Sequence, residues 1–189
     1  ALIKDSIKNR DITDKELRSL MEGMPMMENW QLLIAELLND GAKIAIISGG
    51  LQQTARDIAA KFPSNEPWKR RWGGIDRFTA ERYGNGNDSQ LTIFTNGWLR
   101  GDLTPDGHYK LDDFGRYQVQ MNGKGAIVKM LQRRYNIPKH KTASVGDSAG
   151  DIGMFQESGL GICFNPWDER PIAHCDIVIA EKDLRLVLD

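Results

Sequence analysis

Apolar residues recur along this chain in two alternating patterns, one helical and one extended. Residues 28–39 predict a helix, because apolar side chains return there every three or four positions, at Trp30, Leu33, Ile34, Leu37 and Leu38. Residues 43–50, KIAIISGG, form a short apolar run that is typical of a strand buried on both faces of a parallel sheet. With a second helix predicted at about 52–61, the order helix, strand, helix indicates a doubly wound α/β fold.

The same alternation returns in the C-terminal part of the chain. There the pattern predicts helices at 124–137, 151–159 and 182–188, and strands at 142–147, 161–164 and 176–180. Near the N-terminus, Thr13 and Glu16 form a capping box that predicts a helix ending at Gly23.

The middle of the chain has a different pattern. Residues 63–90 are expected to form loops, whereas LTIFTNGWLRGDL, residues 91–103, alternates apolar and polar positions around Asn96-Gly97. Asn-Gly between two alternating runs is the strongest short-range signal for a hairpin, so we expect a β-hairpin that projects from the sheet.

Composition excludes several classes of protein. The 25 basic and 26 acidic residues give a net charge of −1, so nothing indicates a nucleic-acid partner or a membrane surface. No apolar run is long enough to span a membrane. The two cysteines, Cys163 and Cys175, make neither a disulfide framework nor a zinc pattern. We therefore expect a cytoplasmic protein.

Chemically capable residues follow two of the predicted strands. Ser48-Gly49 ends one strand and Gly146-Asp147 ends another, at the edge where open α/β sheets bind ligands. A serine hydroxyl and glycine N–H groups suit an anion, and the Asp147 carboxylate suits Mg²⁺. Asp151 follows one helical turn later, where it could orient a metal-bound water or hydrogen-bond the loop.

Each of these residues also has a purely structural interpretation. Ser48 could be a turn or N-cap residue, Asp147 could form an Asx turn, and Asp151 could be an N-cap. Lys124 would usually be a solvated lysine at the start of a helix. The whole set, in this order and on these strand ends, favours a shared site over four separate coincidences.

Three segments carry a resemblance to a known family. IAIISGG (44–50), NGKGAIVKML (122–131) and SVGDSAGDIGMF (144–155) resemble the second, third and fourth motifs of the haloacid dehalogenase (HAD) superfamily. Within it, the chain is most similar to phosphoserine phosphatases, and the likeness covers nearly all of it except residues 63–90. The resemblance implies an α/β fold with a doubly wound parallel sheet (HAD-like Rossmannoid), a β-hairpin and the remnant of a helical cap.

The resemblance also implies a reaction and a role for each candidate residue. It implies Mg²⁺-dependent hydrolysis of a small phosphorylated metabolite through an aspartyl-phosphate. Lys124 and Asp151 would be catalytic residues, with Asp151 fixing Lys124 or the surroundings of the metal. Ser48, Gly49 and Lys124 would bind the phosphoryl group, and Asp147 would bind Mg²⁺.

The chain departs from the family pattern in two places. The family's nucleophile lies on an apolar strand ahead of the serine motif, and no such strand is found here; Asp11, Thr13 and Asp14 are better explained by the capping box. We therefore expect residues 1–24 to be the remnant of the cap, residues 25–189 to be the HAD-like core domain, and the nucleophile-bearing part to be absent. Gly150 stands where phosphoserine phosphatases usually carry Asn, which puts the identity of the substrate in doubt.

Two functions remain open on these grounds. One is a phosphoserine phosphatase-like phosphomonoester hydrolase, and the alternative is a catalytically inactive HAD-like phosphate-binding or interaction protein. A sheet without its first strand would expose apolar surface and backbone groups. We accordingly expect a homodimer, or association with the missing N-terminal fragment.

Overall fold

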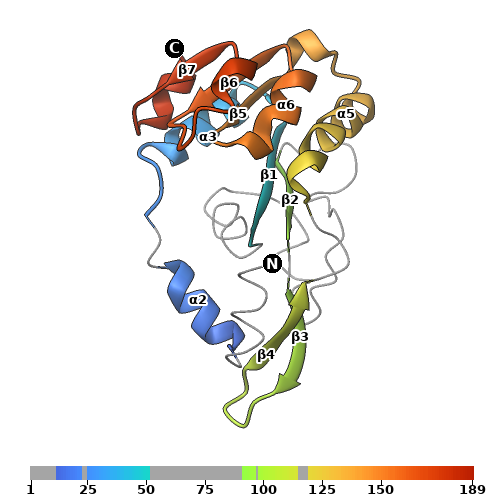
Figure 1. Ribbon diagram of the computed structural model, residues 1–189, viewed down its shortest axis with the longest axis vertical. Helices are drawn as coiled ribbons and strands as arrows, with labels where there is room; N and C mark the ends of the chain where they lie inside the picture. The colour runs from blue at the N-terminus through green and yellow to red at the C-terminus, as the bar shows by residue number, and fades with distance from the viewer. Residues whose placement is uncertain (1–11, 23–24, 52–90, 97, 115–118) are drawn as a thin grey trace. The chain divides into compact units, whose positions relative to one another are not determined.

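The computed structural model describes residues 12–22, 25–51, 91–96, 98–114 and 119–189 (Figure 1). The helix predicted at 52–61 and the loops predicted at 63–90 lie outside these residues. The chain divides into two compact units. The N-terminal unit comprises Ala1–Pro25 and Lys43–Gln118, and the C-terminal unit comprises Met26–Ala42 and Val119–Asp189.

The C-terminal unit is an α/β structure built on three strands. Its helices are α3 (Trp30–Asn39), α5 (Lys124–Tyr135) and α6 (Ile152–Glu157), and its strands are β5 (Ala143–Gly146), β6 (Leu160–Phe164) and β7 (Ile177–Ile179). Five 3-10 turns complete its described elements: η3 (Met121–Gly123), η4 (Lys139–Lys141), η5 (Ala149–Asp151), η6 (Ile172–His174) and η7 (Leu184–Val187).

The three strands form a parallel sheet, as the sequence predicted, and their order in it is β5-β6-β7. The central strand β6 is apolar along its length, and Ile162, Cys163 and Phe164 are each at most 5% exposed. Helix α6 packs against β5 and β6 and also against α5 (Figure 1). The core of this unit therefore lies around β6, and β5 carries its C-terminal end to the surface of the unit.

Helix ends in this unit differ from the prediction by a few residues. Helix α5 stops at Tyr135 because Asn136 adopts the left-handed conformation, with φ 52°, and caps it with two backbone hydrogen bonds. The helix predicted at 182–188 is the shorter 3-10 turn η7, which begins at Asp183 where its carboxylate accepts the N–H of Arg185.

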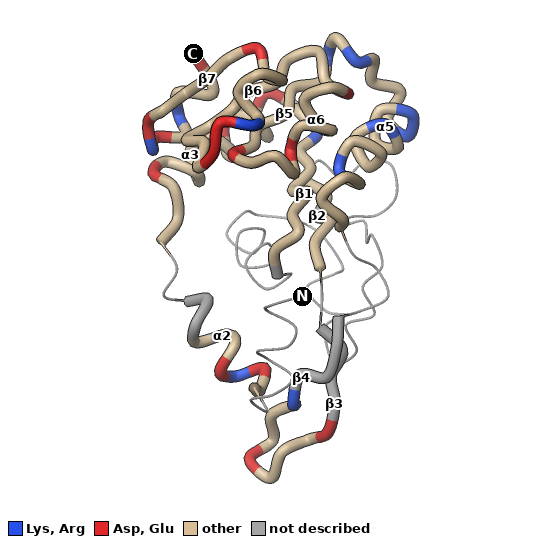
Figure 2. Tube along the Cα trace, viewed as in Figure 1, with Lys and Arg blue, Asp and Glu red and all other residues tan. Residues whose placement is uncertain are grey.

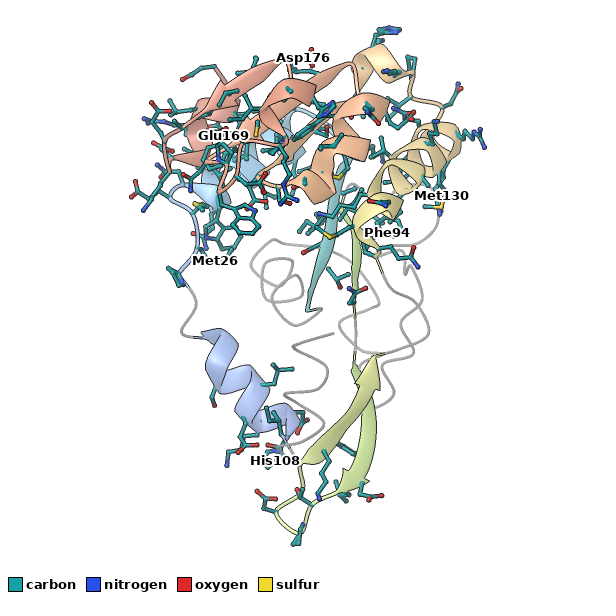
Figure 3. All side chains as sticks on the ribbon, in the orientation of Figure 1. Met26, Phe94, His108, Met130, Glu169 and Asp176 are labelled. Atoms are coloured by element: carbon teal, nitrogen blue, oxygen red, sulfur yellow. The ribbon has the colours of Figure 1, made fainter. Side chains whose placement is uncertain are left out.

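The N-terminal unit contains α2 (Asp14–Glu22), β1 (Ile44–Leu51), β2 (Leu91–Asn96), β3 (Trp98–Leu103) and β4 (Tyr109–Phe114). Strands β1 and β2 pair in parallel, and β3 and β4 pair antiparallel in a second sheet. Phe94 of β2 is 3% exposed and is labelled in Figure 3. The strand predicted at 43–50 is confirmed as β1, which is parallel to β2. The prediction that it is buried on both faces is wrong, because its residues from Ile44 to Ser48 are half-buried, except Ala45, which is exposed.

The predicted hairpin at 91–103 is wrong in its position. Asn96 ends β2 and Trp98 begins β3, and these two strands belong to different sheets. The hairpin lies one strand later, between β3 and β4, where the chain reverses over Thr104-Pro105-Asp106-Gly107-His108. Proline, aspartate and glycine favour a turn at this place, and Gly107 takes a φ of 85°, which glycine adopts without strain.

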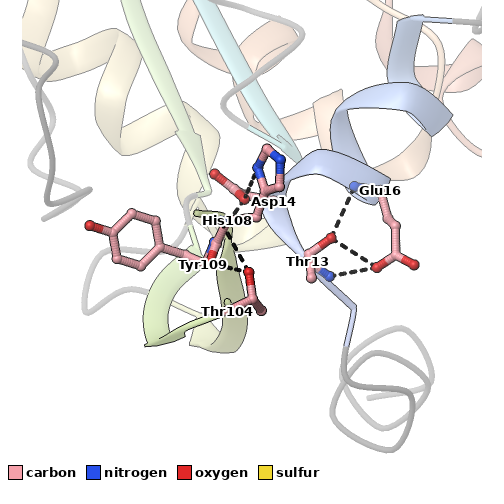
Figure 4. Close-up of polar contacts among 6 residues, drawn as sticks. All are labelled: Thr13, Asp14, Glu16, Thr104, His108 and Tyr109. Atoms are coloured by element: carbon pink, nitrogen blue, oxygen red, sulfur yellow. Dashed lines mark hydrogen bonds and ion pairs between the residues drawn. The ribbon is translucent and has the colours of Figure 1, made fainter. Parts of the chain in front are cut away.

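The predicted capping box at the start of α2 is confirmed. Thr13 donates its N–H to the Glu16 carboxylate at 2.8 Å, and the Thr13 hydroxyl accepts the N–H of Glu16 at 3.3 Å. Asp14 accepts the N–H of Tyr109 at 3.0 Å and lies 3.6 Å from Nδ1 of His108 (Figure 4). These contacts tie α2 to the β3–β4 hairpin. That residues 1–24 derive from a cap remains a prediction.

Charged residues of both signs are interspersed over the described residues of both units (Figure 2). Of the helices that the structure describes, none has the length and hydropathy that a membrane crossing requires. Both cysteines are free thiols; Cys163 is buried and Cys175 half-buried.

Candidate functional site

A lysine and two aspartates of the C-terminal unit meet where β5 ends. Lys124 is the first residue of α5, Asp147 follows β5 directly, and Asp151 ends the turn η5. The Nζ atom of Lys124 donates to Oδ1 of Asp151 at 2.6 Å. The Lys124 and Asp151 side chains are only 13% and 4% exposed. The solvated lysine of the structural interpretation is therefore wrong, because Lys124 is held in a nearly buried ion pair.

The Asp151 carboxylate accepts hydrogen bonds on both oxygens. Besides Lys124, Oδ2 accepts the N–H groups of Asp147 and Ser148, each at 3.1 Å, and the Ser148 hydroxyl at 3.0 Å. Burial alone would raise the pKa of Asp151, but the hydrogen bond and charge of Lys124, with the Ser148 and Asp147 donors, outweigh it and lower that pKa. The charged form of Asp151 is thus favoured, and its carboxylate joins Lys124 to the loop after β5.

Glycine at position 146 makes room for this carboxylate. A Cβ atom on Gly146 would overlap the Asp151 side chain, whose carboxylate atoms Cγ and Oδ2 would lie 2.5 and 2.7 Å from it. Gly150 is buried as well, but a Cβ there would meet the Ser148 hydroxyl at 3.6 Å and Met121 Cγ at 3.7 Å, which is ordinary contact. The absence of a side chain at 150 is therefore not dictated by space for a Cβ.

Asp147 has the opposite electrostatic situation. The residue as a whole is exposed, but its carboxyl lies partly against protein, and this partial loss of water raises its pKa. The negative charge of Asp151 raises that pKa further. Its carbonyl oxygen accepts the N–H of Trp167 at 3.4 Å. The residue is thus fixed by its backbone, while its carboxylate faces a charge of its own sign.

The donor set around Asp147 suits a hard cation that keeps most of its own water. Within the described ranges, no three His, Cys, Asp or Glu side chains gather as a metal-binding group. Asp151 is already committed to Lys124 and the loop, which leaves the Asp147 carboxylate as the available anionic oxygen of this cluster. Mg²⁺ is often bound through one or two carboxylates together with phosphate oxygens and water, so the residues present fit it.

The serine motif lies in the N-terminal unit, on a bulged part of β1. Ser48 is half-buried, and its Oγ accepts the N–H of Gly50 at 3.0 Å, so its hydroxyl hydrogen can donate to another group. The Gly49 carbonyl accepts Nδ2 of Asn96 at 2.8 Å. The structure thus brings Lys124, Asp147 and Asp151 together in one unit. Ser48 and Gly49 belong to the N-terminal unit.

The sequence interpretation missed two polar residues at these sites. Ser148 forms a capping box with Asp151, and the spacing Ser-x-x-Asp is a recognisable signal for one. Asp151 precedes α6 but makes no side-chain hydrogen bond that caps that helix, so the N-cap interpretation is wrong. Its carboxylate instead completes the capping box begun by Ser148 and binds Lys124. Asn96 acts across 47 positions of sequence, and no local pattern announces that contact.

The chain is similar in sequence to known hydrolases. The family model for haloacid dehalogenase-like hydrolases matches residues 119–185. A phosphoserine phosphatase of Methanocaldococcus jannaschii is 27% identical over 181 residues, which is 95% of this chain and 70% of that protein. A phosphoserine phosphatase of Vibrio cholerae is 25% identical, over 84% of this chain and 39% of its own length. This chain thus spans 70% of the length of one of these relatives and 39% of the length of the other.

Solved structures give the same fold. A substrate-bound phosphoserine phosphatase complex superposes with a TM-score of 0.68 at 26% identity, covering 97% of this chain and 75% of that one. A phosphoserine phosphatase in apo form superposes with a TM-score of 0.67 at 24% identity, covering 98% and 80%. The predicted α/β fold and the predicted resemblance are confirmed.

Proposed function

We propose that this chain of the haloacid dehalogenase superfamily, phosphoserine phosphatase-like in sequence and fold, serves the Mg²⁺-dependent hydrolysis of small phosphomonoesters. The observation that carries the proposal is the nearly buried Lys124–Asp151 pair beside the exposed Asp147 carboxylate. A phosphomonoester is a dianion, and its hydrolysis needs positive charge held near the phosphoryl oxygens.

Each residue has a separate task in this proposal. Lys124 supplies an ammonium group, and Asp151 keeps that group in one position through the 2.6 Å contact. The Ser48 hydroxyl and the Gly49 backbone supply hydrogen bonds to phosphoryl oxygens. Because Oγ of Ser48 already accepts the N–H of Gly50, the hydroxyl hydrogen is directed away from its own turn.

Asp147 is the residue that would hold the metal. Mg²⁺ bound there would supply the remaining positive charge at the phosphoryl group. The raised pKa of Asp147 supports this role, since a carboxylate placed beside a second fixed anion gains most from a nearby cation. A single available carboxylate predicts weak Mg²⁺ binding in the absence of phosphate.

The family reaction also needs a nucleophilic carboxylate, which the sequence did not reveal. That the nucleophile-bearing part is absent from this chain is itself part of the proposal. The alternative, an inactive phosphate-binding protein, rests on the same residues, because Lys124, Ser48 and Asp147 would bind a phosphate group whether or not it is cleaved.

The test measures hydrolysis and binding on the same protein. Phosphate release from phosphoserine and from p-nitrophenyl phosphate is followed with and without Mg²⁺, and binding of inorganic phosphate is measured by calorimetry. Asp147→Asn should abolish the Mg²⁺-dependent part of either signal, whereas Lys129→Met, an exposed lysine on the same helix as Lys124, should leave it unchanged. Because we propose that the nucleophile-bearing part is absent from this chain, release is measured after that strand has been restored. Binding without release in the restored protein would favour the inactive alternative, and neither binding nor release there would refute the proposal.

A further inference from the structure

The serine motif occupies an interruption in the pairing of β1 with β2. Ile47 pairs with Phe94 and Leu51 pairs with Asn96, so four steps along β1 accompany two steps along β2. The extra residues of β1 are Ser48, Gly49 and Gly50, which have no regular pairing with β2. They therefore form a bulge in the strand.

Two hydrogen bonds between backbone and side chain hold this bulge. The N–H of Gly50 donates to Oγ of Ser48 at 3.0 Å, and Nδ2 of Asn96 donates to the carbonyl of Gly49 at 2.8 Å. Asn96 is 9% exposed and lies at the end of β2, directly opposite the end of the bulge. Gly49 and Gly50 are exposed, so in this contact only the Asn96 side chain is shielded from water.

These two bonds act on a single peptide group. The carbonyl of Gly49 and the N–H of Gly50 belong to the same planar unit and point in opposite directions. By binding the Gly49 carbonyl, Asn96 fixes the direction of the Gly50 N–H. That N–H donates to Oγ of Ser48, and so determines which lone pair of this oxygen is occupied. The position of the Ser48 hydroxyl hydrogen therefore depends on Asn96.

The chemistry of the position favours an amide. An aspartate would place a carboxylate against the Gly49 carbonyl and lose the donor, and an alanine would leave the carbonyl without its partner. A turn role for Asn96 does not explain the contact, because β2 and β3 belong to different sheets.

We infer that Asn96 is a positioning residue that orients Ser48 for contact with a phosphoryl oxygen. The inference rests on the proposed function, and it adds a residue that acts through the Gly49–Gly50 peptide without touching the substrate. It also assigns the Asn-Gly pair a role other than the hairpin that its sequence predicts.

The first experiment measures the backbone amide signals of the bulge and does not depend on enzymatic activity. In ¹⁵N–¹H spectra, Asn96→Ala should shift the amide signals of Gly49 and Gly50 well beyond the changes caused by Thr95→Val. Thr95 is the matched control, because its hydroxyl is buried on the same strand end without a hydrogen-bond partner in the structure. Asn96→Ser, which keeps a shorter donor, replaces the alanine variant if that variant does not fold. Amide signals that match those of Thr95→Val would overturn the inference.

The second experiment asks whether Asn96 acts through Ser48. Asn96→Ala should weaken binding of inorganic phosphate in Mg²⁺ about tenfold, the effect of one hydrogen bond. In a Ser48→Ala background the same substitution should have no further effect, whereas a general structural disturbance would reduce affinity again. If the two substitutions reduced phosphate affinity independently, so that their effects multiplied in the double variant, the inference would be refuted. A lack of any phosphate binding by the unaltered chain would refute the proposed function, while the amide signals would still decide the role of Asn96.

Discussion

Asp147 and Asp151 are the same residue type four positions apart, and their surroundings shift their pKa values in opposite directions. Asp151 accepts four hydrogen bonds, one of them from an ammonium group, and its pKa is lowered. Asp147 faces that fixed anion, and its pKa is raised by burial and by this charge. Pairs of carboxyl groups divided in this way are common where one group supports the site and the other acts in it.

The ion pair at Lys124 should be costly to break. Lys124→Met leaves Asp151 buried and charged without its main partner, so we expect a loss of about 3–5 kcal/mol in the free energy of unfolding. Lys129→Met removes a 2.8 Å pair with Glu157 whose lysine is 54% exposed, and should cost at most about 1 kcal/mol. Denaturant unfolding of both variants checks this, and equal losses would contradict the assignment.

Asp147 should reduce stability at neutral pH. Its pKa is higher in the folded chain than in the unfolded chain, so its ionisation costs stability once the pH rises above the unfolded value of about 3.9. Asp147→Asn should therefore be more stable than the unaltered chain at pH 7, and the difference should shrink as the pH is lowered towards 4. Thermal unfolding across this range measures it.

The same variant provides a test of metal binding. Mg²⁺ at a hundred times its dissociation constant should stabilise the unaltered chain by about 2.7 kcal/mol. Asp147→Asn should lose this increment. A Mg²⁺-induced shift of equal size in both proteins would place the ion elsewhere.

At the scale of elements, two helices meet at a pair of glycines. A Cβ atom on Gly125 of α5 would lie 2.5 Å from the carbonyl oxygen of Gly153 in α6, which is backbone and cannot turn aside. A Cβ on Gly153 would come no closer than 3.4 Å to Gly125. A side chain would therefore clash at position 125 but fit at position 153, although both residues are glycines.

Alanine at these two positions should have unequal effects. Gly125→Ala should cost about 1–3 kcal/mol, since α5 and α6 must separate. It should also disturb the neighbouring Lys124–Asp151 contact. Gly153→Ala should change stability by no more than about 1 kcal/mol, because its close contact is mild and alanine favours a helix. Thermal unfolding of the two variants gives the comparison, and similar melting temperatures would show that the helices do not cross at this point.

The sequence revealed those elements whose signals are local. Thr13 and Glu16 marked the start of α2, and the apolar runs marked β1 and β6 as strands. The burial predicted for β1 was wrong, since the strand is half-buried. Asn96-Gly97 led to a wrong prediction of a hairpin. A local turn signal carries no information about the hydrogen bond that the Asn96 amide donates to the distant carbonyl of Gly49. The site was predictable in residue type at Lys124, Asp147 and Asp151. Their geometry was not, since the Lys124–Asp151 bond joins residues 27 positions apart.

At the scale of the whole molecule, the sheet of the C-terminal unit bears on association between chains. Among the described residues of this unit, β5 and β7 each pair only with β6. Ile177 and Val178 of β7 are 45% and 46% exposed, and Val145 of β5 is 36% exposed. Edge strands with apolar side chains favour pairing with another chain.

We therefore expect self-association of this 189-residue, 21.3 kDa chain as concentration rises. Val178→Lys should lower the average mass measured by light scattering, because a lysine on an edge strand opposes pairing. Met130→Lys, at a 43% exposed position on α5, is the control and should have no effect. A monomer at every concentration would contradict the expectation.

The bond between Lys124 and Asp151 has a consequence for the order in which ligands arrive. One ammonium group and two carboxylates leave the cluster of Lys124, Asp147 and Asp151 with a net negative charge, so an approaching phosphate dianion is repelled. A divalent cation on Asp147 would reverse that sign. Phosphate affinity should therefore rise with Mg²⁺ concentration, and the two ligands should bind cooperatively. The cation should bind first, because the anion binds well only after the cation has reversed the charge of the cluster.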